Sequence, residues 1–214
     1  RLFVTVGEGS DTPIRDQAQD LSSGLGKVFR INQDGSIPDG NPFADSSQPA
    51  IWSYGHRNVQ SAVVDAEGRL WIVEHGPKGG DELNRPEAGK NYGWPVITYG
   101  LTYGGQPVGQ GITAKEGMEQ PIYYWDPVIA PSGMALYTAD AIPKWKGALL
   151  IGGLITQGLV ILHLDGNRVA TEEHVPLDAR IRDVKVGPDG AVYAVTESRG
   201  WGSGSTILRI AGAS

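Results

Sequence analysis

The chain has 214 residues, with 31 glycines, 14 prolines and no cysteine. Its formal net charge of −6 argues against a nucleic-acid-binding protein, because phosphate binding needs a basic surface. The sequence contains no apolar run of about 18 residues, so no membrane-spanning helix is expected. The absence of cysteine excludes disulfides and thiolate metal sites. High glycine and proline content with few charges favours short strands joined by tight turns.

One pattern recurs along the chain, a turn rich in glycine and aspartate followed by a short apolar strand. Its copies lie at residues 1–7, 65–74, 146–153 and 188–196. The partner strands are expected at residues 26–31, 81–84, 158–164 and 206–210. Irregular repeats of this kind, each forming one small sheet, predict an all-β fold of β-propeller type. At roughly four strands per blade, this chain supplies about four blades.

The remaining segments are less regular. Residues 16–23 can hold one helical turn, and the glycine-rich residues 99–120 are expected to form a long extended loop, a kind of segment that is often functional. The chain starts inside a strand and without methionine, so we expect a single propeller domain over residues 1–214 whose N-terminal blades lie outside it. Open blade edges make self-association a further expectation.

The first candidate site is Trp52-Ser-Tyr-Gly-His-Arg-Asn-Val-Gln60, which places Arg57 and Asn58 at the end of a strand. A guanidinium offers a planar set of donors that suits a carboxylate or a quinone oxygen, and an asparagine adds a donor and an acceptor. On these residues alone, a surface turn with a structural arginine is favoured over a binding site.

The second candidate is Glu74-His-Gly-Pro-Lys-Gly-Gly-Asp-Glu82, followed by residues 89–95. Backbone carbonyls and carboxylates are the ligands that calcium prefers. The alternative is a glycine-rich turn between strands with solvated acids. His75 has no second histidine at a useful spacing for a transition metal, so a structural role is favoured for it.

A third candidate is Arg180-Ile-Arg-Asp183. Residues two apart in a strand face the same side, so Arg180 and Arg182 are expected to point together. This arrangement is costly unless an anion lies between them or solvent reaches both, and the sequence leaves a solvated strand edge equally open. Asp34, Ser36 and Asp39 only loosely match a calcium-binding loop and are interpreted as a turn.

Several common catalytic patterns are missing from the sequence. There is no Gly-x-Ser-x-Gly, no Walker loop and no His-Glu-x-x-His. The glycine-rich segments do not open a helix, which argues against a nicotinamide-binding fold.

Seven segments together resemble the soluble pyrroloquinoline quinone (PQQ)-dependent aldose sugar dehydrogenases of the glucose/sorbosone dehydrogenase family. In chain order they are residues 25–31, 34–43, 52–60, 74–84, 89–95, 130–134 and 180–190. The resemblance implies a six-bladed β-propeller that oxidises aldose sugars at C1 to lactones and passes electrons to an external acceptor. It also implies a periplasmic or secreted protein.

The resemblance implies two cofactors, PQQ and calcium. The residues implied to contact PQQ are Arg57, Asn58, Trp125, Arg180 and Arg182. The carbonyls of Gly76 and Pro77 are implied ligands of the calcium ion that PQQ contacts. A second, structural calcium is implied to use the Glu82 side chain and the Tyr92 carbonyl. A net negative protein that holds a tricarboxylate needs such local positive charge.

The sequence departs from the family pattern in two respects. The family's catalytic histidine lies upstream of this chain, and none of the four histidines here matches it, namely His56, His75, His163 and His174. No general base is therefore assigned, and the chain alone is expected not to turn over sugar. A lysine that contacts the cofactor in relatives is replaced near Ile155.

Two other functions are compatible with a propeller. One is a non-catalytic propeller that binds a ligand or a partner, which the missing histidine favours. The other is a calcium-dependent lactonase, which needs several carboxylates converging on the axis, and the acidic residues do not fall at the expected positions.

Overall fold

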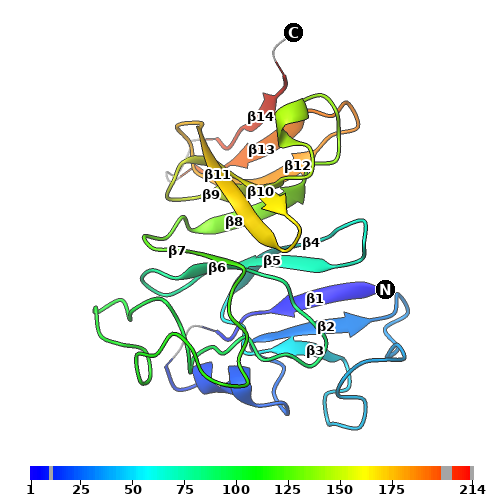
Figure 1. Cartoon of the computed structure of the whole chain (residues 1–214), viewed down its shortest axis with the longest axis vertical. Helices are drawn as coiled ribbons and strands as arrows, with labels where there is room; N and C mark the ends of the chain where they lie inside the picture. Colours follow the sequence, from blue (N-terminus) through cyan, green and yellow to red (C-terminus); the bar gives the residue numbers. More distant parts are fainter. Residues whose placement is uncertain (10–11, 199–203, 213–214) are drawn as a thin grey trace. The chain divides into compact units, whose positions relative to one another are not determined.

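The computed structural model describes residues 1–9, 12–198 and 204–212 (Figure 1). The described residues form four antiparallel sheets and two short 3-10 helices, in two compact units, Arg1–Val128 and Ile129–Ser214. The all-β fold and the four small sheets that the sequence predicts are confirmed. No helix in the described part is long and apolar enough to cross a membrane.

The first unit contains two sheets and one 3-10 helix. The three-stranded sheet has the order β1-β2-β3, with strands Leu2–Val6, Lys27–Ile31 and Ile51–Tyr54. The four-stranded sheet has the order β4-β5-β6-β7, with strands Val59–Val64, Leu70–Glu74, Asp81–Asn84 and Tyr123–Trp125. The 3-10 helix η1, Arg15–Gln19, forms the helical turn expected near residue 16.

The second unit has the same organisation. Its four-stranded sheet has the order β11-β10-β9-β8, with strands Arg168–Pro176, Gly158–Asp165, Leu149–Gly153 and Pro131–Leu136. Its three-stranded sheet has the order β12-β13-β14, with strands Ile181–Val186, Val192–Thr196 and Ile207–Ile210. The 3-10 helix η2 spans Pro143–Trp145.

The local sequence explains the predicted hairpins. In the β4–β5 turn, Gly68 has a φ of +79° and Asp65 Oδ1 accepts a 2.9 Å hydrogen bond from the amide of Arg69. All five residues of the following strand β5 are buried. All four expected strand pairs are present as β1–β2, β5–β6, β9–β10 and β13–β14. The residues 34–36 form a turn, since Asp34 Oδ1 accepts from the Ser36 amide at 3.0 Å.

Each unit has its own apolar core. In the first unit Val28, Leu70 and Ile72 pack with Phe3 and Trp52. In the second unit the core lies between the two sheets and includes Tyr137, Trp145, Leu150, Ile161, Val184 and Val192.

Residues 99–120 form the expected extended loop, which is fastened to the connection between β5 and β6. Lys78 and Leu101 exchange two backbone hydrogen bonds of 2.9 and 2.8 Å. The two segments approach so closely that a Cβ at Gly100 would lie 2.3 Å from the Gly79 carbonyl oxygen. This contact fixes the loop against residues 76–80, one of the candidate sites.

Candidate cofactor and metal site

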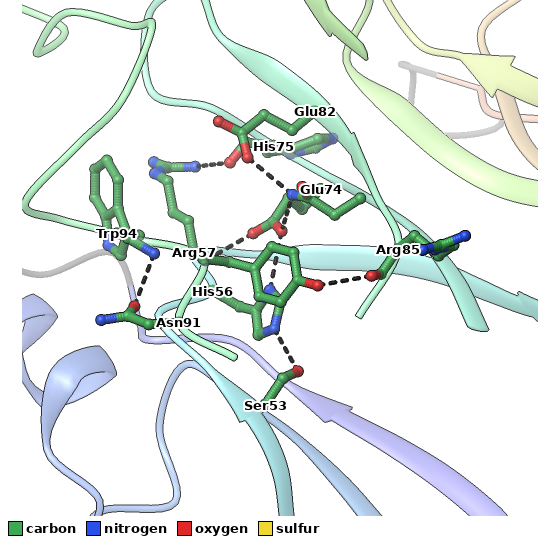
Figure 2. A network of polar contacts seen from close by, with 12 residues as sticks. Ser53, His56, Arg57, Glu74, His75, Glu82, Arg85, Asn91 and Trp94 are labelled. Carbon is green, nitrogen blue, oxygen red and sulfur yellow. Dashed lines mark hydrogen bonds and ion pairs between the residues drawn. The ribbon is translucent and has the colours of Figure 1, made fainter. Parts of the chain in front are cut away.

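Arg57 lies in the short connection between β3 and β4, two residues before β4 begins, and not at the end of a strand as expected. Its guanidinium Nη1 donates to the carbonyls of His75 at 3.0 Å and Gly76 at 2.9 Å. Its backbone amide donates to Glu74 Oε2 at 2.8 Å. Arg57 therefore contacts the main chain that follows β5, which is the second candidate segment (Figure 2).

The guanidinium of Arg57 is almost completely buried. The residue is 6% exposed, and its guanidinium carbon lies 5.2 Å from the centre of the Trp94 ring. Within the described part of the chain, Nε of Arg57 has no hydrogen-bond partner. A cavity of about 90 Å³ lies beside it, lined also by Glu8, Pro77 and Trp94. A buried donor of this kind suits an anionic or carbonyl oxygen of a ligand.

The three glycines of the segment 76–80 are packed without room for side chains. A Cβ at Gly76 would lie 2.2 Å from the Gly79 carbonyl oxygen, and the Gly76 amide donates to Asp81 Oδ1 at 2.9 Å. The Gly80 amide donates to the Trp125 carbonyl at 2.9 Å. The glycines thus allow a compact turn whose carbonyl groups are held in fixed directions.

A very small cavity brings four of the predicted residues together. It has a volume of about 10 Å³ and is lined by Arg57, Gly76, Glu82 and Tyr92, among others. A space of this size holds about one water molecule or one ion. One of the predicted PQQ-contacting arginines and three of the four predicted calcium ligands therefore line one cavity in the first unit.

Carboxylates lie close together on β5 and β6. The side-chain amide of Asn84 donates to Glu74 Oε1 and to Glu82 Oε2, both at 2.9 Å. Burial and the neighbouring charge of Glu74 raise the pKa of Glu82 to about 8. Burial also raises the pKa of Glu74, but the charge of His56 and the hydrogen bonds that Glu74 accepts outweigh it, so its pKa lies below the usual value. The site thus collects acidic oxygens that a divalent cation stabilises.

The remaining predicted residues of the first unit lie nearby. The side chain of Asn58 accepts from Gln60 at 2.9 Å, and its carbonyl accepts from the amide of His75 at 3.0 Å. Tyr92 is buried and its hydroxyl donates to the Arg85 carbonyl at 2.6 Å. Trp125 is 5% exposed and packs edge-on against Tyr123, with 5.3 Å between the ring centroids.

Arg180 and Arg182 lie in the second unit and point together, as the sequence predicts. Both donate to Glu197 Oε2, at 3.2 and 2.6 Å, and Arg180 also donates to the Leu154 carbonyl at 3.0 Å. Burial raises the pKa of Glu197, but the two guanidinium charges hold it below its usual value. The anion between the arginines is therefore a side chain of this protein, which the sequence analysis did not identify.

A cavity of about 580 Å³ opens beside this cluster, lined by Leu154, Ile155, Arg180 and Glu197, among others. Nε of Arg180 is buried and has no hydrogen-bond partner among the described residues. Ile155, where relatives have a lysine by resemblance, is 55% exposed. The arginine pair thus offers one unused donor to a ligand in this cavity.

The residues present fit the two groups that the resemblance implies. For PQQ, each unit taken by itself holds one buried Nε atom without a partner among the described residues, that of Arg57 in the first unit and that of Arg180 in the second, and such a donor suits a carboxylate or quinone oxygen. For calcium, the donors are all oxygens, and the buried Oδ1 of Asn84 has no partner in the described ranges. The described side chains contain no cluster of three His, Cys, Asp or Glu residues suited to a metal, so a calcium site here needs main-chain carbonyls.

Sequence reasoning missed four polar residues that support the site, namely Ser53, His56, Glu74 and Glu197. A signal existed for two of them. Glu74 ends a strand in which every residue is buried, and a buried charge requires a partner. Glu197 follows Thr196, which pairs with Ile181 in the hairpin register, and this register places Glu197 opposite Arg180.

Comparison with known proteins shows which family the chain resembles over most of its length. The family model described as "Glucose / Sorbosone dehydrogenase" matches residues 1–207. The chain is 42% identical over 203 residues to aldose sugar dehydrogenase YliI of Escherichia coli K12, covering 92% of this chain and 54% of that protein. The chain spans about half the length of the curated relatives it matches.

Solved structures show the same fold. A glucose dehydrogenase crystal structure matches with a TM-score of 0.90 and 40% identity, covering 99% of this chain and 61% of that one. The PQQ-bound aldose sugar dehydrogenase of Streptomyces coelicolor matches with a TM-score of 0.75 and 30% identity, covering 97% of this chain and 57% of that one. These matches confirm a six-bladed β-propeller of which this chain supplies four blades. The chain belongs to the glucose/sorbosone dehydrogenase family.

Proposed function

We propose that this chain is part of a PQQ- and calcium-dependent dehydrogenase that oxidises aldose sugars at C1 to lactones and passes the electrons to an external acceptor. The observation that carries the proposal is the buried Arg57 guanidinium. It is held by the carbonyls of His75 and Gly76 beside a cavity, and its Nε has no partner within the described ranges. When bound, calcium-associated PQQ supplies the two-electron acceptor.

Each predicted residue has a role in this proposal. Arg57 and Asn58 bind and orient the quinone end of the cofactor, and Trp125 packs near it. Arg180 and Arg182 bind its carboxylates. In the structure, both arginines pair instead with the carboxylate of Glu197. The carbonyls of Gly76 and Pro77 hold one calcium, and the Glu82 side chain with the Tyr92 carbonyl holds a second one.

Further features are proposed with this function. The two units belong to one propeller domain, the protein is periplasmic or secreted, and open blade edges allow self-association. The outer strand β14 has exposed residues, including Ile207 at 69%, so it is suited to strand pairing.

Titration calorimetry with PQQ and calcium tests the proposal. We expect calcium-dependent binding in the submicromolar range that an Arg180→Ala/Arg182→Ala variant loses. The matched control is Arg168→Ala/Arg209→Ala, because these two arginines are exposed in the same unit and pair with Asp165 and Asp189. Equal binding by both double variants contradicts the proposed roles of Arg180 and Arg182.

The second candidate is a propeller that binds a ligand without catalysis. The environment of three histidines favours it. His56 is completely buried. His163 on β10 contacts Glu173 on β11, and His174 contacts Glu172 within β11. Calcium-dependent PQQ binding without any reduction of the bound quinone by aldoses, in a protein that also has the upstream histidine, favours this second function.

A further inference from the structure

Three buried side chains form a hydrogen-bonded relay behind Arg57 (Figure 2). Ser53 Oγ lies 2.8 Å from His56 Nε2, and His56 Nδ1 lies 3.1 Å from Glu74 Oε1. Ser53 and His56 are 0% exposed and Glu74 is 4% exposed. Since Glu74 is an acceptor, Nδ1 of His56 carries a proton. Nε2 accepts from the serine hydroxyl when the ring is neutral and donates to it when the ring is charged.

The relay has the atom order of a hydrolase triad but cannot act as one. A nucleophilic serine must touch its substrate, and Ser53 has no exposed surface. Its hydroxyl is therefore a structural partner of His56. The role of the relay must lie at its other end, at Glu74.

Glu74 holds the main chain of Arg57. Its Oε1 accepts a hydrogen bond from His56, and its Oε2 accepts one of 2.8 Å from the backbone amide of Arg57. The guanidinium of Arg57 donates to the carbonyls of the two residues that follow Glu74, namely His75 and Gly76. Arg57 is thus fixed at its backbone by the Glu74 side chain and at its guanidinium by the carbonyls beyond Glu74.

Packing restricts the relay to one arrangement. The His56 ring stacks on the Tyr92 ring, with 4.9 Å between centroids and 19° between planes. Asn84 donates to the same Glu74 oxygen that receives His56, at 2.9 Å. Because three donors bind its carboxylate, the Glu74 side chain has little freedom to rotate. The backbone of Arg57, which donates to this carboxylate, is therefore restricted as well.

We propose that Ser53, His56 and Glu74 are positioning residues that orient Arg57 toward its ligand oxygen. This inference rests on the proposed function, because the ligand is the PQQ that Arg57 is proposed to bind. An alternative is that the relay only joins β3 to β5 and contributes nothing but stability. The two roles differ in what happens to Arg57 when the relay is broken.

The first test compares PQQ affinity with stability. His56→Phe keeps a ring against Tyr92 and removes both hydrogen bonds. We expect it to weaken calcium-dependent PQQ binding about tenfold, the usual effect of losing an outer-shell partner. The control is Tyr137→Phe in the second unit, whose buried hydroxyl donates to the Gly190 carbonyl and accepts from the Ile142 amide. A similar fall in melting temperature for both variants, with unchanged PQQ affinity for His56→Phe, overturns the inference.

The second test needs no cofactor and separates this inference from the proposed function. The Nε–H signal of Arg57 is followed by nitrogen-15 NMR in the wild type, in His56→Phe and in the milder Ser53→Ala. We expect a shifted and faster-exchanging signal in His56→Phe, and a smaller change in Ser53→Ala. If the wild type does not bind PQQ, the proposed function fails while this signal still decides the inference. If both variants fold, an unchanged Arg57 signal in both overturns the inference. If His56→Phe does not fold, an unchanged Arg57 signal in Ser53→Ala overturns it.

Discussion

The ammonium group of Lys27 donates a 2.6 Å hydrogen bond to the carbonyl of Leu25 from a position with no exposed surface. The same group donates to the carbonyls of Gln17 and Ala18 at 2.9 and 3.0 Å. Lys27 thereby fastens the helix η1 to β2, and η1 in turn carries Gln19, which contacts Asn91 and the Trp94 carbonyl.

This contact predicts a dependence of stability on alkaline pH. Burial lowers the pKa of Lys27 to about 8 from 10.5, so the unfolded chain binds more protons between these values. Stability should therefore rise with pH across this window, by about 2 kcal/mol. Urea unfolding at pH 7.5 and pH 10 measures it. Lys27→Met should lack the rise, and an identical rise in that variant contradicts the assignment.

The raised pKa of Glu82 predicts that the stability of the calcium-free protein changes with pH in the opposite direction, at lower pH. Its pKa of about 8 lies above the ordinary value of 4.5, so the folded chain binds more protons between the two. Stability should fall as the pH rises from 5 to 8. Calcium should remove much of this fall, because a cation stabilises the carboxylate. Melting temperatures with calcium and with a chelator, for the wild type and Glu82→Gln, test both statements, and a fall of equal size in Glu82→Gln contradicts the first.

Gly76→Ala should distort the segment between β5 and β6. The added Cβ would lie 2.2 Å from the Gly79 oxygen and 2.3 Å from the Gly80 oxygen, so backbone must move. We expect a loss of about 2 kcal/mol in unfolding free energy and weaker calcium binding. Gly104→Ala is the control, because its added Cβ meets only Thr102 Oγ1 at 3.9 Å. Comparable losses in both variants show that the turn is not specifically restricted.

Glu197 predicts a dependence on acidic pH. The nearby arginines hold the pKa of Glu197 below its ordinary value of 4.5, despite partial burial. Its stabilising contribution is present above that value and is lost as the pH falls through the lower, folded pKa. Glu197→Gln should therefore be less stable at pH 6 and lose less stability down to pH 3. Parallel pH profiles of unfolding for the two proteins contradict this expectation.

The chain alone should not oxidise sugars. None of its four histidines matches the family base, and His56 is enclosed by Ser53 and Glu74. Steady-state assays with PQQ, calcium, an aldose and an artificial electron acceptor measure this. Sustained turnover by the purified chain shows that another group supplies the base.

The sequence predicted the hairpins well because their causes are local. Asp-x-Gly turns and apolar strands such as residues 70–74 carry their own signal. The edge strand β11 and the strand β8 gave no such signal. Strand β11 has a polar sequence, and β8, at the other edge of the same sheet, contains Pro131 and Gly133, which weaken the signal for a strand. Their strand conformation depends on pairing with β10 and β9.

The candidate site was predicted only in part. Arg57, Gly76 and Glu82 were identified through the resemblance, and the structure brings them to one small cavity. The contacts between Asn84 and the carboxylates of Glu74 and Glu82 depend on the register between β5 and β6, which composition does not specify. All assignments to the two cofactors stay predictions, both the PQQ contacts (Arg57, Asn58, Trp125, Arg180 and Arg182) and the calcium ligands (Gly76, Pro77, Glu82 and Tyr92).

The amide of Asn84, placed between two carboxylates, has a consequence for inherited variation. An asparagine codon becomes an aspartate codon by one base change, and the side chain keeps its shape and volume. Yet the exchange replaces the donor shared by Glu74 and Glu82 with a fourth acidic group beside Glu74, Asp81 and Glu82. A substitution that is nearly isosteric is therefore among the least tolerable at this position, and lineages should change Asn84 only together with one of the acids.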